Sequence, residues 1–287
     1  MPSQSLDTTP IKLIASDLDG TLLNRFHSTD PFILKTIDRV LEQNIHFVLA
    51  TGRAMQGKEF EMNFGQREVY IICNNGALLM NHQQEVLYKQ AIPVSFIEKT
   101  LNKFPDLAFD FIGVKETWVN TSKATYLKGF EAEKNIISKK VLKMAHKYLR
   151  KRHFDTPSST ILEQEIIKIN GRIHDSQQLA QFKQHLKESP EVVNLPFAEG
   201  LFELTEKSVN KAASLHRLCS ILEVDKNKVV VFGDGGNDLE LLEQFPHSYA
   251  PKNASYEAKV RAKKVIGSNT MYSVPRKIRK LLRQQAQ

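Results

Sequence analysis

The chain alternates between short apolar runs and longer stretches whose apolar residues recur at helical spacing. Four runs rich in β-branched residues lie at 11–16, 45–50, 69–73 and 229–232. Such runs predict buried strands, and the helical pattern at 30–44 predicts a helix between the first two. This order indicates an α/β fold with a parallel sheet. Ligands bind beyond the carboxyl ends of such strands, so the polar residues that follow each run are candidates for a site.

Asp17 and Asp19 follow the first predicted strand, with Gly20 directly after them. Side chains two positions apart on an extended chain point to the same side, and Gly20 allows the chain to turn. Two carboxylates this close repel each other unless a cation lies between them or one of them holds a proton. The pattern therefore predicts a metal ion, a shared proton, or both.

Thr51, Gly52 and Arg53 follow the second predicted strand. A threonine hydroxyl at a strand end can donate a hydrogen bond to a phosphoryl oxygen, glycine allows close backbone approach, and arginine supplies a positive charge. By itself, this tripeptide is equally consistent with an ordinary turn.

The fourth predicted strand ends in Gly233-Asp234-Gly235-Gly236-Asn237-Asp238. Two acids flanking a glycine-rich turn can converge on one hard cation, and a few carboxylate oxygens with water suit octahedral Mg²⁺. A calcium loop or a plain turn is the alternative, although the alternating ligands of an EF-hand are missing.

Residues 81–204 show a different pattern, in which the predicted strands do not end in acids. Strands are expected at 86–89, 107–112, 117–120, 165–169, 192–195 and 201–204, and helices at 94–103, 138–152 and 176–189. This mixture predicts a compact α+β module inserted into the parallel-sheet domain. The runs at 77–80 and 85–88 also fit the two arms of a hairpin.

Composition narrows the class of protein. The 287 residues, of which 41% are hydrophobic and 25% charged, are typical of a globular protein with one large domain or two smaller ones. The N-terminal segment lacks an apolar core, and we find no apolar run long enough for a bilayer, so neither secretion nor membrane insertion is expected. Cys73 and Cys219 are too few for a disulfide framework, which favours a reducing, cytoplasmic location.

The formal net charge of +8 suits anionic partners such as phosphorylated metabolites, nucleic acid or anionic lipid. The excess is concentrated at 123–152 and 276–283, and both segments fit solvated helical faces. Neither has the interleaved aromatic residues of a nucleic-acid-binding surface, so nucleic acid is a disfavoured partner. The oligomeric state cannot be predicted from these patterns.

Four motifs resemble those of the haloacid dehalogenase (HAD) superfamily, in the same order. They are Asp17-Leu18-Asp19-Gly20-Thr21, Ala50-Thr51-Gly52-Arg53, Lys207-Ser208-Val209-Asn210-Lys211 and Gly233-Asp234-Gly235-Gly236-Asn237-Asp238. Asn74-Asn75-Gly76-Ala77 is similar to the point at which Cof-type members leave their core domain. The resemblance implies a Rossmann-like core domain (1–80 and 205–287) and an inserted α+β type IIB cap domain (81–204). Such a cap closes over the active site and selects the substrate.

The resemblance also implies roles for individual residues. Asp17 is expected to be the nucleophile, Asp19 the general acid and base, and Lys211 the cation that neutralises the phosphoryl group, with Lys207 as the alternative lysine. A lysine at a helix start opposes the helix dipole, so Lys211 has no local structural benefit there and favours a ligand. Substrate and phosphate contacts are expected from Thr51, Gly52, Arg53, Asn75 and Asn237. Mg²⁺ is expected on the Asp17 carboxylate, the Asp19 main-chain carbonyl and Asp234, with Asp238 binding through water or as support.

The predicted function is Mg²⁺-dependent hydrolysis of small phosphorylated metabolites, such as sugar phosphates or phosphorylated cofactors, through an aspartyl-phosphate. A phosphotransferase or phosphomutase would share this intermediate and differ in the acceptor. A basic protein that binds nucleic acid or a partner on an inherited HAD scaffold is the third alternative, and the four intact acids argue against it. Pro251-Lys252 and Ser273-Val274 depart from the usual Cof-type residues, so substrate contacts are not transferred from relatives.

Overall fold

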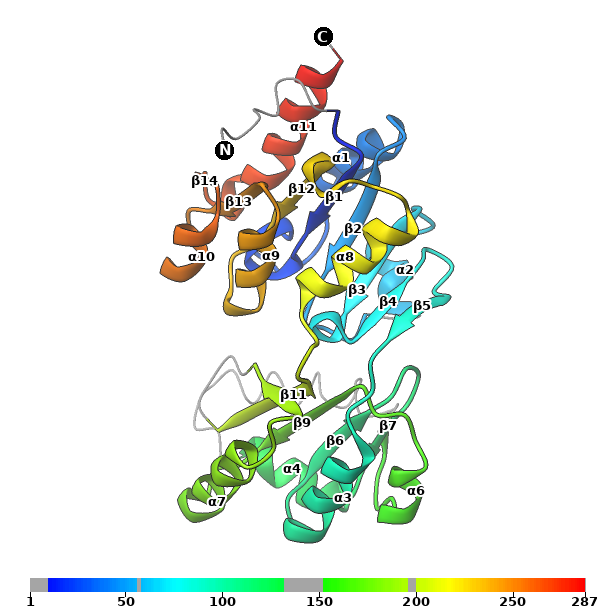
Figure 1. The fold of residues 1–287 in the computed structure, drawn as a ribbon, viewed down its shortest axis with the longest axis vertical. Helices are drawn as coiled ribbons and strands as arrows, with labels where there is room; N and C mark the ends of the chain where they lie inside the picture. The colour runs from blue at the N-terminus through cyan, green and yellow to red at the C-terminus, as the bar shows by residue number, and fades with distance from the viewer. Residues whose placement is uncertain (1–9, 56–57, 132–151, 196–199, 287) are drawn as a thin grey trace. The chain divides into compact units, whose positions relative to one another are not determined.

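The computed structural model describes residues 10–55, 58–131, 152–195 and 200–286, and the chain forms two compact units (Figure 1). The core unit consists of Met1–Lys89 and Val209–Gln287, and the inserted unit of Gln90–Ser208. The first division therefore lies at 89/90 and not at the expected 80/81, because β5 (Val86–Lys89) pairs with β4 (Leu78–Met80) and extends the core sheet. The second lies at 208/209 and not at 204/205, since β11 (Leu201–Glu206) belongs to the sheet of the inserted unit.

The core unit is built on an eight-stranded sheet in the order β14-β13-β12-β1-β2-β3-β4-β5. Its six parallel strands are β1 (Leu13–Ser16), β2 (His46–Ala50), β3 (Val69–Cys73), β12 (Val229–Phe232), β13 (His247–Pro251) and β14 (Lys264–Ile266). β4 and β5 continue it as an antiparallel hairpin. The α/β fold predicted from the alternation of strand and helix patterns is confirmed.

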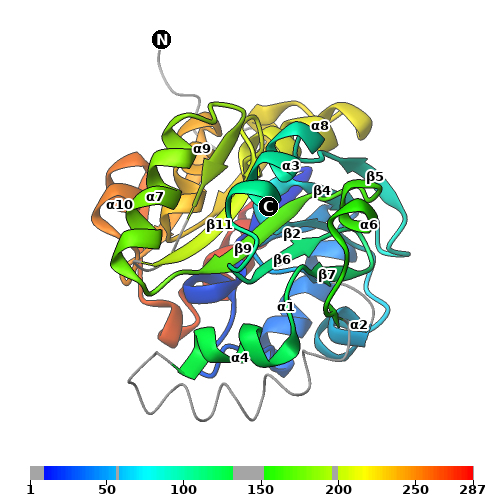
Figure 2. The same ribbon diagram turned by 90° about the horizontal axis from the view of Figure 1, so that it is seen from below.

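Helices cover both faces of this sheet (Figure 2). α8 (Lys211–Ile221) and α9 (Leu239–Gln244) pack on one face, against apolar side chains of β1, β2 and β12. α1 (Pro31–Leu41), α2 (Lys58–Phe64) and α11 (Ser273–Gln285) lie on the other, and α10 (Tyr256–Arg261) contacts α9. α1 starts where it does because the Asp30 carboxylate accepts the N–H groups of Phe32 and Ile33, with Pro31 at the first position. Within the described ranges, every helix is too short or too polar to cross a membrane.

The inserted unit has a six-stranded sheet in the order β10-β11-β9-β6-β7-β8. Its other strands are β6 (Phe109–Ile112), β7 (Thr117–Val119), β8 (Arg152–His153), β9 (Lys168–Arg172) and β10 (Val192–Asn194). The helices among its described residues are α3 (Val94–Lys103), α4 (Lys123–Glu131), α6 (Ser158–Leu162) and α7 (Ser176–Lys187). A cluster of buried aromatic side chains, including Phe96, Phe109 and Phe182, gives the unit a core of its own.

Some elements differ from the sequence prediction. The strand expected at 165–169 occupies Lys168–Arg172, where it pairs with β6 and β11. The helices α2, α6 and α10 were not predicted, because helices this short depend on tertiary packing more than on their own periodicity. α4 lies in the basic segment 123–152, for which a helical face was expected. The helix expected at 138–152 lies outside the described residues except for Arg152, which belongs to β8.

Candidate active site

The predicted site residues gather at the carboxyl ends of the parallel strands of the core unit. Asp17 follows β1, Thr51 follows β2, Asn75 follows β3 and Asp234 follows β12, while Lys211 is the first residue of α8. The pairing β12-β1-β2-β3 makes these strand ends neighbours at one edge of the sheet. The turns therefore bring together residues that are far apart in the sequence.

Asp17 is held at the end of β1 by its own backbone. Its N–H donates to the Phe232 carbonyl at 2.9 Å, which fixes the end of β1 against β12, and the residue is only 5% exposed. The next turn needs Gly20, whose φ of +75° is in the left-handed region. A Cβ atom at Gly20 would also lie 2.2 Å from Asp234 Oδ2, so only glycine lets the two loops approach this closely. Asn253, which the sequence analysis did not select, donates to the Gly20 carbonyl at 2.8 Å.

Lys211 lies at the centre of a buried network of charges. Its Nζ donates to Asp17 Oδ1 and to Asp238 Oδ1, both at 2.6 Å, and its side chain is fully buried. Burial lowers the pKa of Lys211, but the two carboxylates outweigh burial and raise it, so the side chain is protonated. The alternative lysine, Lys207, is exposed and belongs to the inserted unit.

The position of Lys211 is set by the start of α8. The Asn210 side chain caps the helix by accepting the Ala213 N–H at 2.7 Å. Ser214 Oγ donates to the Gly76 carbonyl at 2.5 Å, which ties the turn after β3 to the first turn of α8. A Cβ atom at Gly76 would lie 2.3 Å from the Asn210 carbonyl oxygen, so glycine is required for this contact.

Asp17, Asp234 and Asp238 offer carboxylate oxygens that all lie within 4.8 Å of one another. Asp234 Oδ1 accepts the Thr21 hydroxyl at 2.7 Å, and Asp238 Oδ2 accepts the N–H groups of Asp234 and Gly235 at 2.9 and 3.0 Å. Both oxygens of Asp238 are therefore engaged, which favours the supporting role expected for it. Burial, together with the neighbouring carboxylates, raises the pKa of Asp17 and of Asp234. Several hard oxygen donors at one point fit a divalent cation.

The Asp19 side chain lies apart from this carboxylate cluster and is 39% exposed. Arg53 Nε donates to Asp19 Oδ2 at 2.6 Å, a second guanidinium nitrogen bonds Oδ1, and His27 Nδ1 lies 2.9 Å from Oδ1. Burial raises the pKa of Asp19, but the hydrogen bonds from Arg53 and His27 outweigh it, so the net pKa is lowered. His27 was missed in the sequence analysis, because no spacing rule connects a loop histidine to the acid that it contacts.

The remaining predicted residues meet at the ends of β2 and β3. Thr51 is buried, and its Oγ1 accepts the Arg53 N–H at 3.1 Å. Asn237 Nδ2 donates to Asn75 Oδ1 at 3.0 Å, and a Cβ atom at Gly52 would lie 2.7 Å from the same Asn75 oxygen. Contacts within this group therefore connect the loop after β2 with those after β3 and β12.

Asn74 is a further candidate that the sequence analysis did not select. Among the described residues, its buried side-chain nitrogen and oxygen have no hydrogen-bond partner. Buried polar groups are normally paired, so an orphan amide beside a predicted phosphate site is a candidate ligand contact. The Asn-Asn doublet at the end of an apolar strand was the only available signal for it.

Comparisons with known proteins agree along most of the chain. The sequence model of the haloacid dehalogenase-like hydrolase family matches residues 14–278. The 5-amino-6-(5-phospho-D-ribitylamino)uracil phosphatase YbjI of Escherichia coli (strain K12) is 28% identical over 285 residues, which cover 96% of this chain and 98% of that protein.

Solved structures share the fold of this chain at lower sequence identity. A haloacid dehalogenase-like hydrolase from Bacteroides thetaiotaomicron superposes with a TM-score of 0.77 at 22% identity, over 94% of this chain and 99% of that one. The HAD subclass IIB sugar phosphatase BT4131 superposes with a TM-score of 0.70 at 19% identity, over 94% and 98% of the two chains.

Proposed function

Because the chain belongs to the haloacid dehalogenase-like hydrolase family and is a Cof-type member, we propose that it is a phosphatase of small phosphorylated metabolites. The observation that carries this proposal is the contact of Lys211 with Asp17 and Asp238 in a buried site at the strand ends. A buried lysine beside a carboxylate provides the positive charge that an incoming phosphate dianion requires. The relatives named above as phosphatases support the same class of reaction.

We propose Mg²⁺ as the cofactor, held by the Asp17 and Asp234 carboxylates and the Asp19 main-chain carbonyl. Asp238 supports the site through Lys211 and the backbone of Asp234 and Gly235. When bound, the ion would offset negative charge on the phosphoryl oxygens. Thr21 contributes by orienting Asp234 through its hydroxyl.

In the first step, an Asp17 carboxylate oxygen attacks phosphorus in line and forms an aspartyl-phosphate as the ester P–O bond breaks. Lys211 stabilises the charge that collects on the phosphoryl group, and Thr51 donates a hydrogen bond to one of its oxygens. Asp19 donates its proton to the departing alkoxide. In the second step, Asp19 accepts a proton from water, which attacks the aspartyl-phosphate and releases inorganic phosphate.

The ion pair between Arg53 and Asp19 affects whether Asp19 can donate a proton. Arg53 favours the ionised form of Asp19, whereas donation to the leaving group requires the protonated form. A phosphoryl group is a competing partner for the Arg53 guanidinium, because it offers more charge and more acceptor oxygens. We propose that substrate draws Arg53 away from Asp19 and so prepares the acid.

The test is phosphate release from a panel of small phosphate esters, with and without Mg²⁺, by wild type, Asp17→Asn and Asp106→Asn. Asp106 is an exposed acid of the inserted unit, so its variant is matched in chemistry but lies outside the site. Metal-dependent release is expected from wild type and Asp106→Asn and is expected to be abolished in Asp17→Asn. Activity near wild type in Asp17→Asn would overturn the nucleophile assignment.

The same panel addresses the substrate class. The relatives are named for a phosphorylated ribitylamino-uracil and for sugar phosphates, and both are small phosphate monoesters. We therefore include phosphorylated sugars and a phosphorylated ribitylamino-uracil among the esters. Transfer of the phosphoryl group to an added alcohol, with no free phosphate, would instead indicate a phosphotransferase.

A further inference from the structure

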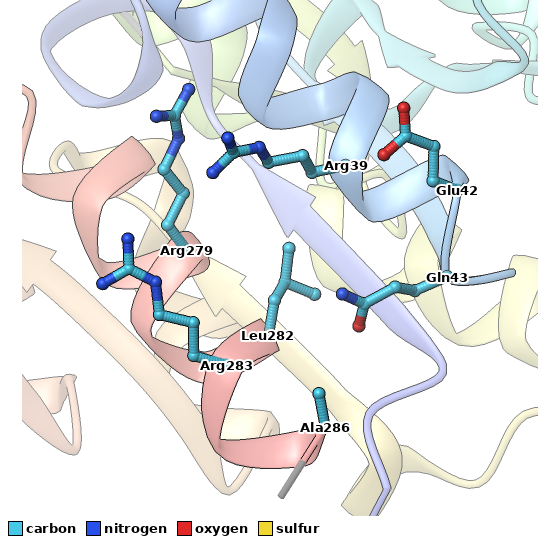
Figure 3. A pocket seen from close by; sticks show the side chains of 7 residues that line it. All are labelled: Arg39, Glu42, Gln43, Arg279, Leu282, Arg283 and Ala286. Carbon is cyan, nitrogen blue, oxygen red and sulfur yellow. The ribbon is translucent and has the colours of Figure 1, made fainter.

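A second cluster of positive charge lies in the core unit, in a cavity of ≈ 270 Å³ between α1 and α11. Arg39 on α1 and Arg279 and Arg283 on α11 line it, together with Glu42, Gln43 and Leu282. Figure 3 shows the guanidinium group of Arg39 pointing from α1 toward Arg279, while Arg283 extends from the next turn of α11. Arginines of two helices therefore line one cavity.

Arg279 is held firmly in place. Its Nε donates to Thr36 Oγ1 at 2.8 Å and its Nη2 to the Phe32 carbonyl at 3.2 Å. Its guanidinium carbon also lies 4.0 Å from the centre of the Phe32 ring, a cation–π contact. These bonds leave other N–H groups of Arg279 available to a ligand, in a geometry that needs no rearrangement.

Arg39 and Arg283 lack such partners, as neither makes a hydrogen bond or ion pair with any described residue. Among the described residues, Glu42 is the one acid of the cavity lining, and in Figure 3 its carboxylate lies on the side of α1 away from the three guanidinium groups. Burial and the charges of Arg39 and Arg283 lower the pKa of Arg279, as expected for guanidinium groups that repel one another. An anion in the cavity would relieve this repulsion.

The cavity is separate from the catalytic site. The Gln285 side chain at the end of α11 accepts the Ile11 N–H at 2.7 Å, so this end of the helix lies beside the start of β1. Asp17 lies at the opposite end of that strand, and the extended chain between them spans about 20 Å. Neither the proposed nucleophile nor the Asp234 cluster lines the cavity.

We propose that this cavity binds a compact phosphate group, either as inorganic phosphate or as the phosphate of a small metabolite. Three guanidinium groups bind best to a ligand that has more than one negative charge and several acceptor oxygens. Phosphate has both properties. A single carboxylate supplies neither. The volume and the apolar wall at Leu282 suit a small ligand and not an extended nucleic-acid strand.

The test is calorimetric titration of the full chain in metal-free buffer, which excludes metal-dependent binding at the catalytic site. The ligands are inorganic phosphate, diphosphate and a small phosphate ester, and a single-stranded DNA oligonucleotide is titrated for comparison. The pocket variant is Arg39→Gln with Arg283→Gln. The control is Lys35→Gln with Lys280→Gln, which removes the same charge from exposed positions of the same two helices outside the cavity lining.

We expect one site per chain, with affinity reduced about tenfold or more in the pocket variant and unchanged in the control. Tighter binding of the ester than of inorganic phosphate would identify the phosphate of a metabolite as the ligand, and equal binding would identify inorganic phosphate. No binding to wild type, equal weakening in both variants, or preferential binding of the oligonucleotide would overturn the proposal. Circular dichroism of both variants checks that the fold is retained.

Discussion

At the scale of single residues, Lys211 is the position on which the site depends most. Its ammonium group is fully buried between Asp17 and Asp238. The positive charge of Lys211 therefore compensates both buried carboxylates. Removing one member of a buried ionic network leaves an uncompensated charge, which costs far more than the loss of an exposed ion pair.

Lys211→Met is therefore expected to lower stability by about 3–5 kcal/mol and kcat/KM by about a hundredfold or more. Lys207→Met, which changes the exposed lysine four residues earlier, is expected to change neither. Urea unfolding and steady-state kinetics with the best ester measure both effects. Equal activity losses in the two variants would contradict the choice of Lys211.

Gly20 allows a test of how closely the two catalytic loops must approach. Gly20→Ala combines a positive φ, which costs about 1–2 kcal/mol, with a clash against Asp234. Gly65→Ala has a similar φ of +63° and only Arg67 Nη1 nearby, at 3.5 Å, so it isolates the backbone term. We therefore expect a larger loss of stability in Gly20→Ala than in Gly65→Ala, and a loss of kcat/KM of about a hundredfold in Gly20→Ala alone.

Whether a site residue could be predicted from the sequence depends on which structural feature positions it. Asp17 and Thr51 were visible because each directly follows an apolar strand, and Asp234 and Asp238 because they lie in the glycine-rich turn after another. The structure brings these residues to one edge of the sheet. The contacts of His27 with Asp19 and of Asn253 with Gly20 depend on loop conformation, which leaves no periodic trace in the sequence.

At the scale of elements, the start of α8 places Lys211. The Asn210 side chain satisfies a backbone N–H that the helix itself cannot pair. Asn210→Ala is expected to lower the free energy of unfolding by about 1 kcal/mol, and Asn210→Ser, which keeps a capping oxygen, to restore most of it. Denaturant midpoints of the two variants test this expectation, and equal midpoints would show that the cap contributes little.

Elements were predictable where strand and helix patterns were strong. β3, β12 and α3 occupy the predicted residues, whereas β9 begins three residues later than expected. Ile166 and Ile167 are buried although they precede β9, so the apolar run starts before the strand does. A continuous apolar run shows burial but does not fix where pairing starts.

At the scale of the whole molecule, three of the described histidines are half-buried or buried, which favours their neutral form. Burial lowers the pKa of His46 and His247 in the core unit and of His185 in the inserted unit, where Lys103 and Lys99 also lower it and Glu188 and Glu191 oppose them. Below about pH 6.5 the unfolded chain binds protons that these folded histidines do not. Their contribution to stability is therefore complete above that pH, and it is lost as the pH falls from there through their lower pKa values in the folded state.

We expect His185→Gln to reduce the difference in unfolding free energy between pH 7.5 and pH 5.5. The comparison with wild type is needed because the raised pKa values of Asp17 and Asp234 act in the opposite direction. Urea unfolding of both proteins at the two pH values provides the measurement. An unchanged pH dependence in the variant would show that His185 does not take part.

The order of strands in the core sheet has a consequence for synthesis on the ribosome. β1 lies between β2 and β12, so one of its edges stays unpaired until Val229–Phe232 has been made. At typical elongation rates this delay is on the order of ten to forty seconds. The inserted unit is continuous in sequence and can fold during that interval, while the nascent first half of the core exposes an apolar strand edge. Chaperones that shield such edges would then have their main task in the interval between translation of the first and the last third of the message.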